Sequence, residues 1–230
     1  MEVKMKNNDI AVIMRSALFR GVGEKETESM LGCLSAERRA YEKGAYIYQY
    51  GDMVDAIGLV TEGTANVINE DYWGNRNIVA VIQPGETFAE SYAGVGIPIG
   101  VSVQCLEKTQ VIFLNIRKVL TTCSSACAFH TRLIQNLITL LASKNLLMNE
   151  KLTYLTRRNT RDKLLAYLSA ESMKKKSASF SIPFDRQQLA DFLSVDRSAM
   201  SGELSRMQKE GIISYKKNQF TLCTSFDERD

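Results

Sequence analysis

The sequence lacks the features that mark membrane and secreted proteins. No apolar run approaches the ~20 residues that a membrane-spanning helix needs. The first residues are polar and lysine-bearing, with no apolar stretch after them that would make a signal peptide. We therefore expect a cytoplasmic protein with no membrane partner. The net charge of +3 over 230 residues is too small to name a partner by itself.

Cysteine and histidine are also scarce. The five cysteines are scattered and odd in number, which argues against a disulfide framework. Cys123 and Cys127 lie four residues apart, but two thiols without further ligands make a poor metal site, and buried structural thiols are the favoured interpretation. The single histidine, His130, has no obvious partner for catalysis. We therefore predict no catalytic residue, no metal, no cofactor and no enzyme activity.

Residues 184–213 predict two short helices joined by a tight turn. Met200, Leu204 and Met207 recur at helical spacing in the second helix, and Asp196 before it is a suitable N-cap. The opposite face carries an arginine and small hydroxyls, which suit the base edges of the DNA major groove. An ordinary helical hairpin with a solvated polar face is the alternative. The polar face consists of Arg197, Ser198, Ser201 and Ser205.

The segment after the second helix strengthens the DNA-binding interpretation. Gly211 ends the helix, and residues 212–215 and 219–222 predict a small hairpin with Lys216 and Lys217 at its tip. A basic hairpin beside a helix-turn-helix is expected to touch a phosphate backbone. Positive charge also collects here: residues 150–230 hold 15 Lys+Arg and 11 Asp+Glu, against 14 and 15 in residues 1–149. We predict a winged helix-turn-helix.

The first half of the chain has a different texture. Between residues 38 and 115, short apolar or alternating runs recur between glycine-bearing turns. Many short strands of this kind predict an antiparallel barrel, sandwich or roll.

A long helical pattern follows over residues 125–155. Its length, about 45 Å at 1.5 Å per residue, and its broad apolar stripe favour packing on its own barrel and on a partner helix together. Packing within the chain alone is the alternative. The predicted dimerisation residues are Ile134, Leu137, Leu141, Met148, Leu152 and Leu155. Beyond this helix, the lysine run 174–176 predicts a solvated loop, with phosphate contact as the minority interpretation.

This order of parts resembles the cyclic-AMP receptor protein/fumarate–nitrate regulator (CRP/FNR) family of bacterial transcription regulators. The segment TRDKLLAYL (160–168) is similar to the first helix of the family's DNA-binding domain, and RQQLADFLSVDRSAMSGEL (186–204) stands in the place of its helix-turn-helix. The glycine-rich segment matches the turn positions of the family's roll. Those positions are Gly44, Gly51, Asp52, Gly63, Gly74, Gly85 and Glu86.

The resemblance implies an α+β fold in three parts. An antiparallel β-roll, similar to cyclic-nucleotide-binding domains (a double-stranded β-helix) and preceded by helices, would span 1–124. A long dimerisation helix would span 125–156, and a winged helix-turn-helix 157–230. The implied function is a homodimeric, effector-responsive regulator that places the helix Asp196–Glu210 on a palindromic operator. Its expected partners are double-stranded DNA, a second copy of itself, RNA polymerase and an unidentified small-molecule effector.

The predicted effector pocket departs from the cyclic-AMP pattern. Glu90 stands in the family's glutamate position, but residues 99–101, just before Ser102, hold no arginine to clamp a cyclic phosphate. Cyclic AMP is therefore disfavoured. A small organic effector is one interpretation, and a constitutive DNA binder with a vestigial pocket is the other. The predicted effector-binding residues are Phe88, Glu90, Tyr92, Val101, Ser102, Met148 and Asn149.

The predicted DNA-binding residues fall into two groups. Arg197, Ser198 and Ser201 are the expected base readers. Ser198 stands where a glutamate is common in the family, and Gly202 where a second arginine often sits, so we expect an operator unlike those of the name-giving regulators. The alternative function is a ligand-binding signalling module whose C-terminal domain contacts a protein. The expected DNA-backbone contacts are Gln187, Arg206, Lys216 and Lys217.

Overall fold

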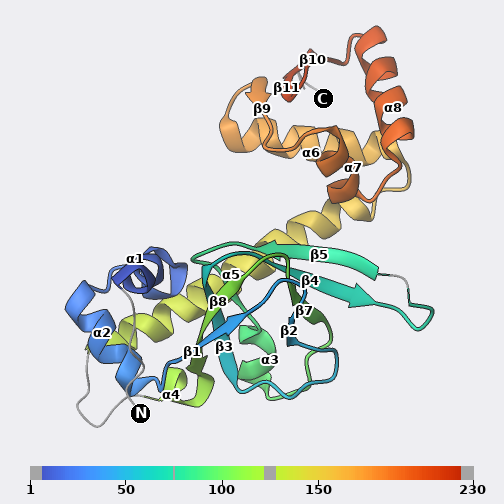
Figure 1. The fold of residues 1–230 in the computed structure, drawn as a ribbon. Coiled ribbons are helices and arrows are strands. Elements are labelled where there is room, and N and C mark those ends of the chain that lie inside the picture. Colours follow the sequence, from blue (N-terminus) through green and yellow to red (C-terminus); the bar gives the residue numbers. More distant parts are fainter. Residues whose placement is uncertain (1–6, 75, 122–127, 224–230) are drawn as a thin grey trace. The chain divides into compact units, whose positions relative to one another are not determined.

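The computed structural model describes residues 7–74, 76–121 and 128–223 (Figure 1). The chain divides into two compact units, Met1–Ser143 and Lys144–Asp230. Their boundary falls inside one long helix, so the three-part division into 1–124, 125–156 and 157–230 stays a prediction. None of the described helices has both the length and the apolar character needed to cross a membrane.

The first unit begins with three short helical segments: α1 (Asn7–Arg15), the 3₁₀ helix η1 (Ala17–Phe19) and α2 (Glu24–Cys33). The Ser16 hydroxyl accepts a hydrogen bond from the Phe19 backbone N–H, which caps η1. Ile13, Phe19 and Met30 are buried in the core of this unit. The helices therefore supply apolar side chains to the same core as the strands that follow.

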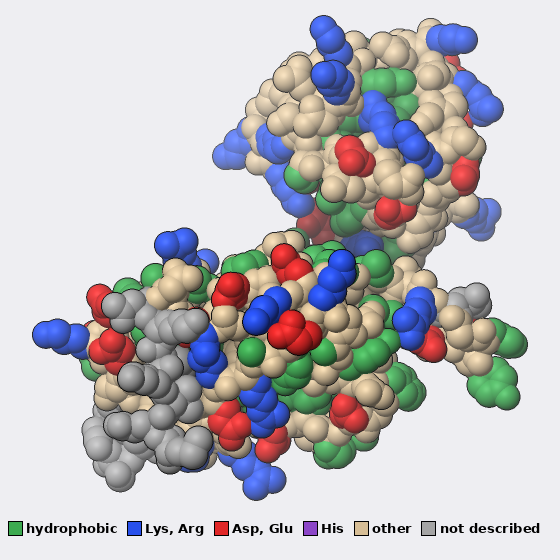
Figure 2. Space-filling model, viewed as in Figure 1, with side chains coloured by type: hydrophobic (Ala, Val, Ile, Leu, Met, Phe, Trp, Pro, Cys, Tyr) green, Lys and Arg blue, Asp and Glu red, His purple; other side chains and the backbone are tan. Residues whose placement is uncertain are grey.

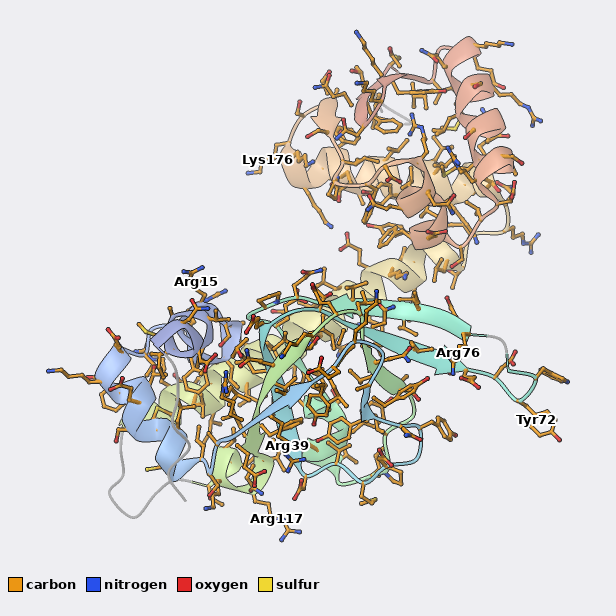
Figure 3. The ribbon with its side chains drawn as sticks, in the orientation of Figure 1. Arg15, Arg39, Tyr72, Arg76, Arg117 and Lys176 are labelled. Carbon is orange, nitrogen blue, oxygen red and sulfur yellow. The ribbon has the colours of Figure 1, made fainter. Side chains whose placement is uncertain are left out.

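Two four-stranded antiparallel sheets form the body of the first unit. One has the order β1-β8-β3-β6 and the other β2-β7-β4-β5. This confirms the antiparallel roll and the α+β fold class. Tyr72 projects from the β4–β5 hairpin (Figure 3) and is 95% exposed, and Trp73 is 82% exposed. The strands are β1 (Glu37–Tyr41), β2 (Tyr46–Tyr48), β3 (Ala56–Glu62), β4 (Ala65–Glu70), β5 (Arg76–Ile82), β6 (Thr87–Phe88), β7 (Ser102–Cys105) and β8 (Thr109–Asn115).

An aromatic cluster fills part of the roll interior. The Phe88 ring meets Tyr48 and Phe113 edge-on, with centroids 6.2 and 6.4 Å apart. Gly58 makes this packing possible, because a Cβ there would lie 2.2 Å from the Phe88 ring. The Arg39 guanidinium lies 5.0 Å from the centre of the Phe113 ring (Figure 3). Packing within the roll core thus explains why Phe88 is buried.

Two short helices complete the roll: α3 (Glu90–Val95) and α4 (Ile116–Leu120). The N-cap of α3 is Ala89, which has a φ of +65°, and its C-cap is Gly96, which has a φ of +75°. Glycine adopts such left-handed backbone readily, whereas alanine is strained there.

Helix α5 (Ala128–Leu155) packs its first half against the roll. Leu133 and Leu137 are buried in the core of the first unit, and the Asn136 amide donates to the carbonyls of Leu18 and Arg20, both at 2.9 Å. His130 is buried as well, in keeping with a packing role. The predicted start of this helix at Ser125, and the pair Cys123 and Cys127, lie outside the described residues.

The second unit contains α6 (Thr160–Lys175), α7 (Arg186–Leu193), α8 (Arg197–Lys209) and a three-stranded sheet of order β10-β11-β9. Its strands are β9 (Ser179–Ser181), β10 (Ile213–Lys216) and β11 (Gln219–Leu222). The winged helix-turn-helix is confirmed. The lysine loop was wrong in part, because Lys174 and Lys175 belong to the last turn of α6, where cations suit the helix dipole, and only Lys176 lies beyond it as the C-cap.

The two ends of α3 allow a paired test of backbone strain. Ala89→Gly should raise the free energy of unfolding by about 0.5–1 kcal/mol, because glycine relieves the positive φ. Gly96→Ala should lower it by a similar amount, since a methyl group there meets no atom within 4 Å and the effect is confined to the backbone. Urea unfolding of both variants measures the two changes. Loss of stability in Ala89→Gly would contradict this assignment.

Candidate nucleic-acid interface

Capping residues set where α7 begins and ends and where α8 begins. Asp185 and Gln188 form a capping box at the start of α7: the Asp185 carboxylate accepts from the Gln188 N–H at 2.8 Å, and the Gln188 side chain accepts from the Asp185 N–H at 2.9 Å. Helix α7 ends at Ser194, which has a φ of +50°. Two residues later Asp196 caps α8. The turn is short because both caps are supplied within it.

A shared apolar core holds the two helices together. Met200, Leu204 and Met207 of α8 are fully buried, and so are Leu189 and Ala190 of α7. This confirms the apolar pattern predicted for the second helix. The opposite face of α8 is open: Arg197, Ser198 and Ser205 are exposed, and Ser201 is half-buried.

The Ser198 hydroxyl is already engaged at the start of α8. It donates to the Asp196 carboxylate at 2.5 Å, and the Ala199 N–H donates to the same oxygen at 2.8 Å. These two hydrogen bonds, the Ser198 one first, hold the pKa of Asp196 below its usual range. A hydroxyl has one proton, so Ser198 retains only acceptor capacity toward a base.

A charge network not foreseen in the sequence joins α6 to α8. The Arg161 guanidinium pairs with Glu210, in contact through both of its terminal nitrogens, and lies 3.4 Å from Glu203. The hydrogen bond that Arg161 donates to Glu210 raises the pKa of Arg161 and lowers that of Glu210. Glu203 also pairs with Arg206 at 3.1 Å. The i,i+3 spacing of Glu203 and Arg206 signals that pair, whereas the contact to Arg161 needs the fold.

The wing presents its lysines on a fixed turn. Lys216 and Lys217 are exposed, and Lys217 has a φ of +54° at the tip of the β10–β11 hairpin. Asn218 holds the tip against the residue after β9, because its amide donates to the Ile182 carbonyl at 3.1 Å and its own carbonyl accepts from the Ile182 N–H at 2.9 Å. The predicted hairpin is confirmed.

Arg186 ties the wing to α7, and sequence reasoning missed it. Its guanidinium lies 4.7 Å from the centre of the Tyr215 ring and 5.3 Å from that of Phe220. Burial lowers the pKa of Arg186. Beside it, the exposed Gln187 donates to the Asp191 carboxylate at 2.8 Å. Lys and Arg side chains project at several points around the surface of this unit (Figure 2), as the charge count predicts.

The end of α5 is built into the same unit. Tyr154 is buried against the rings of Tyr167 and Phe192, at centroid distances of 5.6 and 6.2 Å. Its hydroxyl donates to Glu150 at 2.6 Å, and Lys174 pairs with Glu150 at 2.5 Å. Burial first, then the neighbouring Glu150, raises the pKa of Tyr154. The last turns of α5 are therefore fastened to α6 and α7.

The predicted effector residues have different environments. Phe88 and Glu90 are buried, and the Thr87 hydroxyl donates to Glu90 at 3.2 Å. Tyr92 and Val101 are half-buried against the roll core. Ser102 is half-buried, and its hydroxyl oxygen accepts from the Tyr50 N–H at 3.1 Å.

The remaining two predicted effector residues, Met148 and Asn149, are exposed and belong to the second unit. Their participation in a roll pocket stays a prediction. Over the parts of the chain that the structure describes, no group of three or more His, Cys, Asp or Glu residues could hold a metal ion.

The cap of α8 predicts a pH dependence. The lowered pKa of Asp196 means that its carboxylate stabilises the fold above the ordinary value of 3.8, and that this contribution is lost as pH falls through the lowered pKa. Asp196→Asn keeps a capping side chain that does not titrate. The stability difference between wild type and Asp196→Asn should therefore shrink as pH falls below 3.8, in urea unfolding at a series of pH values. A pH-independent difference would show that the carboxylate is not the group responsible.

Comparison with known proteins returns the same two-part organisation. The cyclic nucleotide-binding domain model matches residues 38–126, and the Crp-like helix-turn-helix domain model matches residues 162–224. The Cyclic AMP receptor protein of Thermus thermophilus is 32% identical over 75 residues, 33% of this chain and 34% of that protein. The match thus spans about a third of this curated relative.

Solved structures share the fold along most of the chain. The Catabolite Activator Protein of Thermus thermophilus has a TM-score of 0.54 at 24% identity, covering 90% of this chain and 93% of that one. The c-di-GMP responsive global regulator CLP of Xanthomonas campestris has a TM-score of 0.53 at 16% identity, covering 86% and 98%. With the roll, the winged helix-turn-helix and both family models in this order, the chain belongs to the CRP/FNR family of transcription regulators.

Proposed function

We propose that this protein is a homodimeric transcription regulator that binds a palindromic DNA operator through α8. The observation that carries the proposal is the two-sided character of α8. Its apolar face is fully buried, and its polar face, which begins with Arg197, is exposed beside a basic wing. A helix so presented can enter the major groove while the wing reaches a phosphate backbone.

Arg197 is the strongest candidate for reading a base. It is the first residue of α8, and the N-terminal residues of a recognition helix are the ones that reach base edges. A guanidinium can donate two parallel hydrogen bonds to a guanine. Ser198 would serve as an acceptor only, because its proton is directed to Asp196. Ser201, which is half-buried, has less reach.

Backbone contacts are proposed for Gln187, Lys216 and Lys217, all of them exposed, and for Arg206. Arg206 shares its charge with Glu203 at 3.1 Å, so it would add less attraction to a phosphate than either wing lysine. Glu203 in turn is held by Arg161 of α6. Among the described residues, no acid forms an ion pair with Lys216 or Lys217 of the wing, so their charges are available to a phosphate.

Pairing of two chains is proposed along α5. Met148 and Leu152, four residues apart on one face, are 66% and 50% exposed, and the neighbouring Leu146 and Leu147 are 69% and 64% exposed. Apolar exposure of this extent marks an interaction surface. Leu137 fits the seam poorly, because only 3% of it is exposed. Ile134, Leu141 and Leu155 are half-buried within the single chain, so the proposed seam centres on Met148 and Leu152.

Cyclic AMP is not the proposed effector. None of residues 99–101 is an arginine, and Glu90 is buried beside Thr87. A cyclic phosphate there would therefore lack a cationic partner. The buried, ring-packed Phe88 favours the alternative of a roll that holds no effector and a protein that binds DNA constitutively. RNA polymerase remains an expected partner by family membership.

DNA binding predicts different losses for two single-charge variants. Arg197→Ala should cost about 1–3 kcal/mol on a selected operator and relax one base position, with a smaller loss on random duplex. Lys217→Gln removes the charge without placing a glycine at the strained tip. It should weaken binding to the operator and to random duplex alike, and lower the salt slope of binding by about 1. Fluorescence anisotropy over a salt series measures both.

Lys25→Gln, which removes the same charge at an exposed position of α2, is the matched control and should change neither value. Equal losses for Arg197→Ala on operator and random duplex would remove Arg197 as a base reader. If no fragment binds with a steep salt dependence, the protein-contact alternative is favoured instead.

If two chains pair along α5, introducing positive charges into the seam should convert the dimer to a monomer. The double variant Met148→Lys/Leu152→Lys should sediment as a monomer at micromolar concentrations, because two ammonium groups cannot be buried against a partner's leucines. Ser143→Lys is the control: Ser143 is exposed and lies about half a helical turn away from the Leu152 side. A wild-type chain that is already monomeric, or a double variant that stays dimeric, would contradict pairing through these residues.

A further inference from the structure

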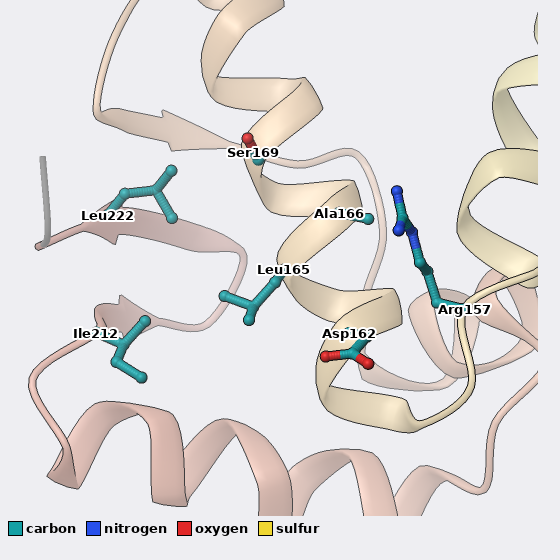
Figure 4. A pocket seen from close by; sticks show the side chains of 7 residues that line it. All are labelled: Arg157, Asp162, Leu165, Ala166, Ser169, Ile212 and Leu222. Atoms are coloured by element: carbon teal, nitrogen blue, oxygen red, sulfur yellow. The ribbon is translucent and has the colours of Figure 1, made fainter. Parts of the chain in front are cut away.

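The second unit contains a cavity whose lining includes none of the residues proposed to contact DNA. It has a volume of about 320 Å³, at the lower end of the range of small-molecule pockets. Its apolar wall comes from three different places in the fold: Leu165 on α6, Ile212 between α8 and β10, and Leu222 at the end of β11 (Figure 4). All three side chains are half-buried, which leaves apolar surface facing the hollow.

The rim of this cavity carries one available positive charge. Arg157, from the connection between α5 and α6, lines the cavity, with Ala166 of α6 beside it in Figure 4. Among the described residues the Arg157 guanidinium has no hydrogen bond or ion pair. Ser169 adds a hydroxyl to the lining. An arginine free to bind an anion, next to an apolar wall, favours a ligand with a negatively charged head and an apolar body.

Asp162 is the other charged residue of the lining, and its carboxylate is already used. It accepts from the Asn159 amide at 3.0 Å, while the Asn159 side chain accepts from the Asp162 N–H at 2.8 Å. Asp162 also lies in the first turn of α6, where the helix dipole offsets a negative charge. It therefore opposes an anion less than its formal charge suggests.

Taken together, these residues lead us to infer a binding site for a small amphipathic carboxylate between α6 and the wing. The carboxylate would pair with Arg157, and the hydrocarbon would lie on Leu165, Ile212 and Leu222. The inference does not depend on DNA binding, so it can fail or stand independently of the proposed function.

The position of Ile212 gives such a ligand a structural consequence. The Ile212 N–H donates to the Met207 carbonyl of α8 at 3.0 Å, and its carbonyl accepts from the Cys223 N–H at 2.9 Å, just beyond β11. Ile212 is thus bonded to the recognition helix and to the wing at once. A ligand that packs on Ile212 and Leu222 while bound to Arg157 would brace the α8–wing connection against the start of α6.

Three probes with one hydrocarbon chain and different heads test the site on the full chain. Octanoate should bind saturably with one molecule per chain by isothermal titration calorimetry, and more tightly than octanol or octylamine. Arg157→Gln should lower the octanoate affinity about tenfold, to the level of octanol, which corresponds to ~1.4 kcal/mol. Arg158→Gln, the adjacent exposed arginine outside the lining, is the matched control and should bind octanoate as wild type does.

A second variant separates the cavity from non-specific binding. Ala166→Leu places extra atoms in the lining and should abolish binding of octanoate and octanol together, with folding checked by the thermal unfolding transition. The inference is overturned if octanoate binding does not saturate, if Arg157→Gln leaves it unchanged, or if octylamine binds best, since Asp162 would then be the head-group partner. A higher octanoate affinity after deletion of residues 224–230 would also overturn it, because the cavity would then belong to the chain's own C-terminal segment.

Discussion

Helix α5 contributes buried side chains to two separate hydrophobic cores. Leu133 and Leu137 of α5 are buried in the core of the first unit, and Tyr154 near the end of the same helix is buried in the core of the second. Neither core covers the stretch between them, where Leu146, Leu147 and Met148 stand exposed. An apolar surface of this kind is costly in water, and a second copy of the same helix is the covering that the proposed dimer supplies.

In the second unit, the side chains proposed to contact DNA stand on elements that are held together by several side-chain contacts. Arg161 holds the acids of α8, Arg186 stacks on the wing, and the aromatic contacts of Tyr154 fasten the last turns of α5 to α6 and α7. These contacts make α8, the wing and the end of α5 parts of one compact body. The cavity lined by Ile212 adjoins the connection between α8 and the wing.

The sequence predicted what depends on local periodicity and turn chemistry. The buried triad Met200, Leu204 and Met207, the Asp196 cap and the two-stranded wing all follow from spacing and residue type, and all are confirmed. What failed or was missed depends on three-dimensional partners. A heptad-like pattern cannot tell which leucines face the chain's own core, so the predicted seam includes Leu137, which is 3% exposed in the single chain and whose role in dimerisation stays a prediction. The sequence also could not show that the Ser198 hydroxyl donates its hydrogen bond to Asp196, or that the Arg186 guanidinium lies over two rings.

The symmetry of the DNA site tests pairing through α5 most directly. Duplexes selected from a random pool by the full chain should carry two inverted half-sites with centres one helical turn apart, roughly 34 Å, and should bind two chains. Inserting about five base pairs between the half-sites turns them to opposite sides of the duplex, so two-chain binding should be lost. Selection of a single asymmetric site that binds one chain, with an affinity indifferent to the insertion, would contradict the paired regulator.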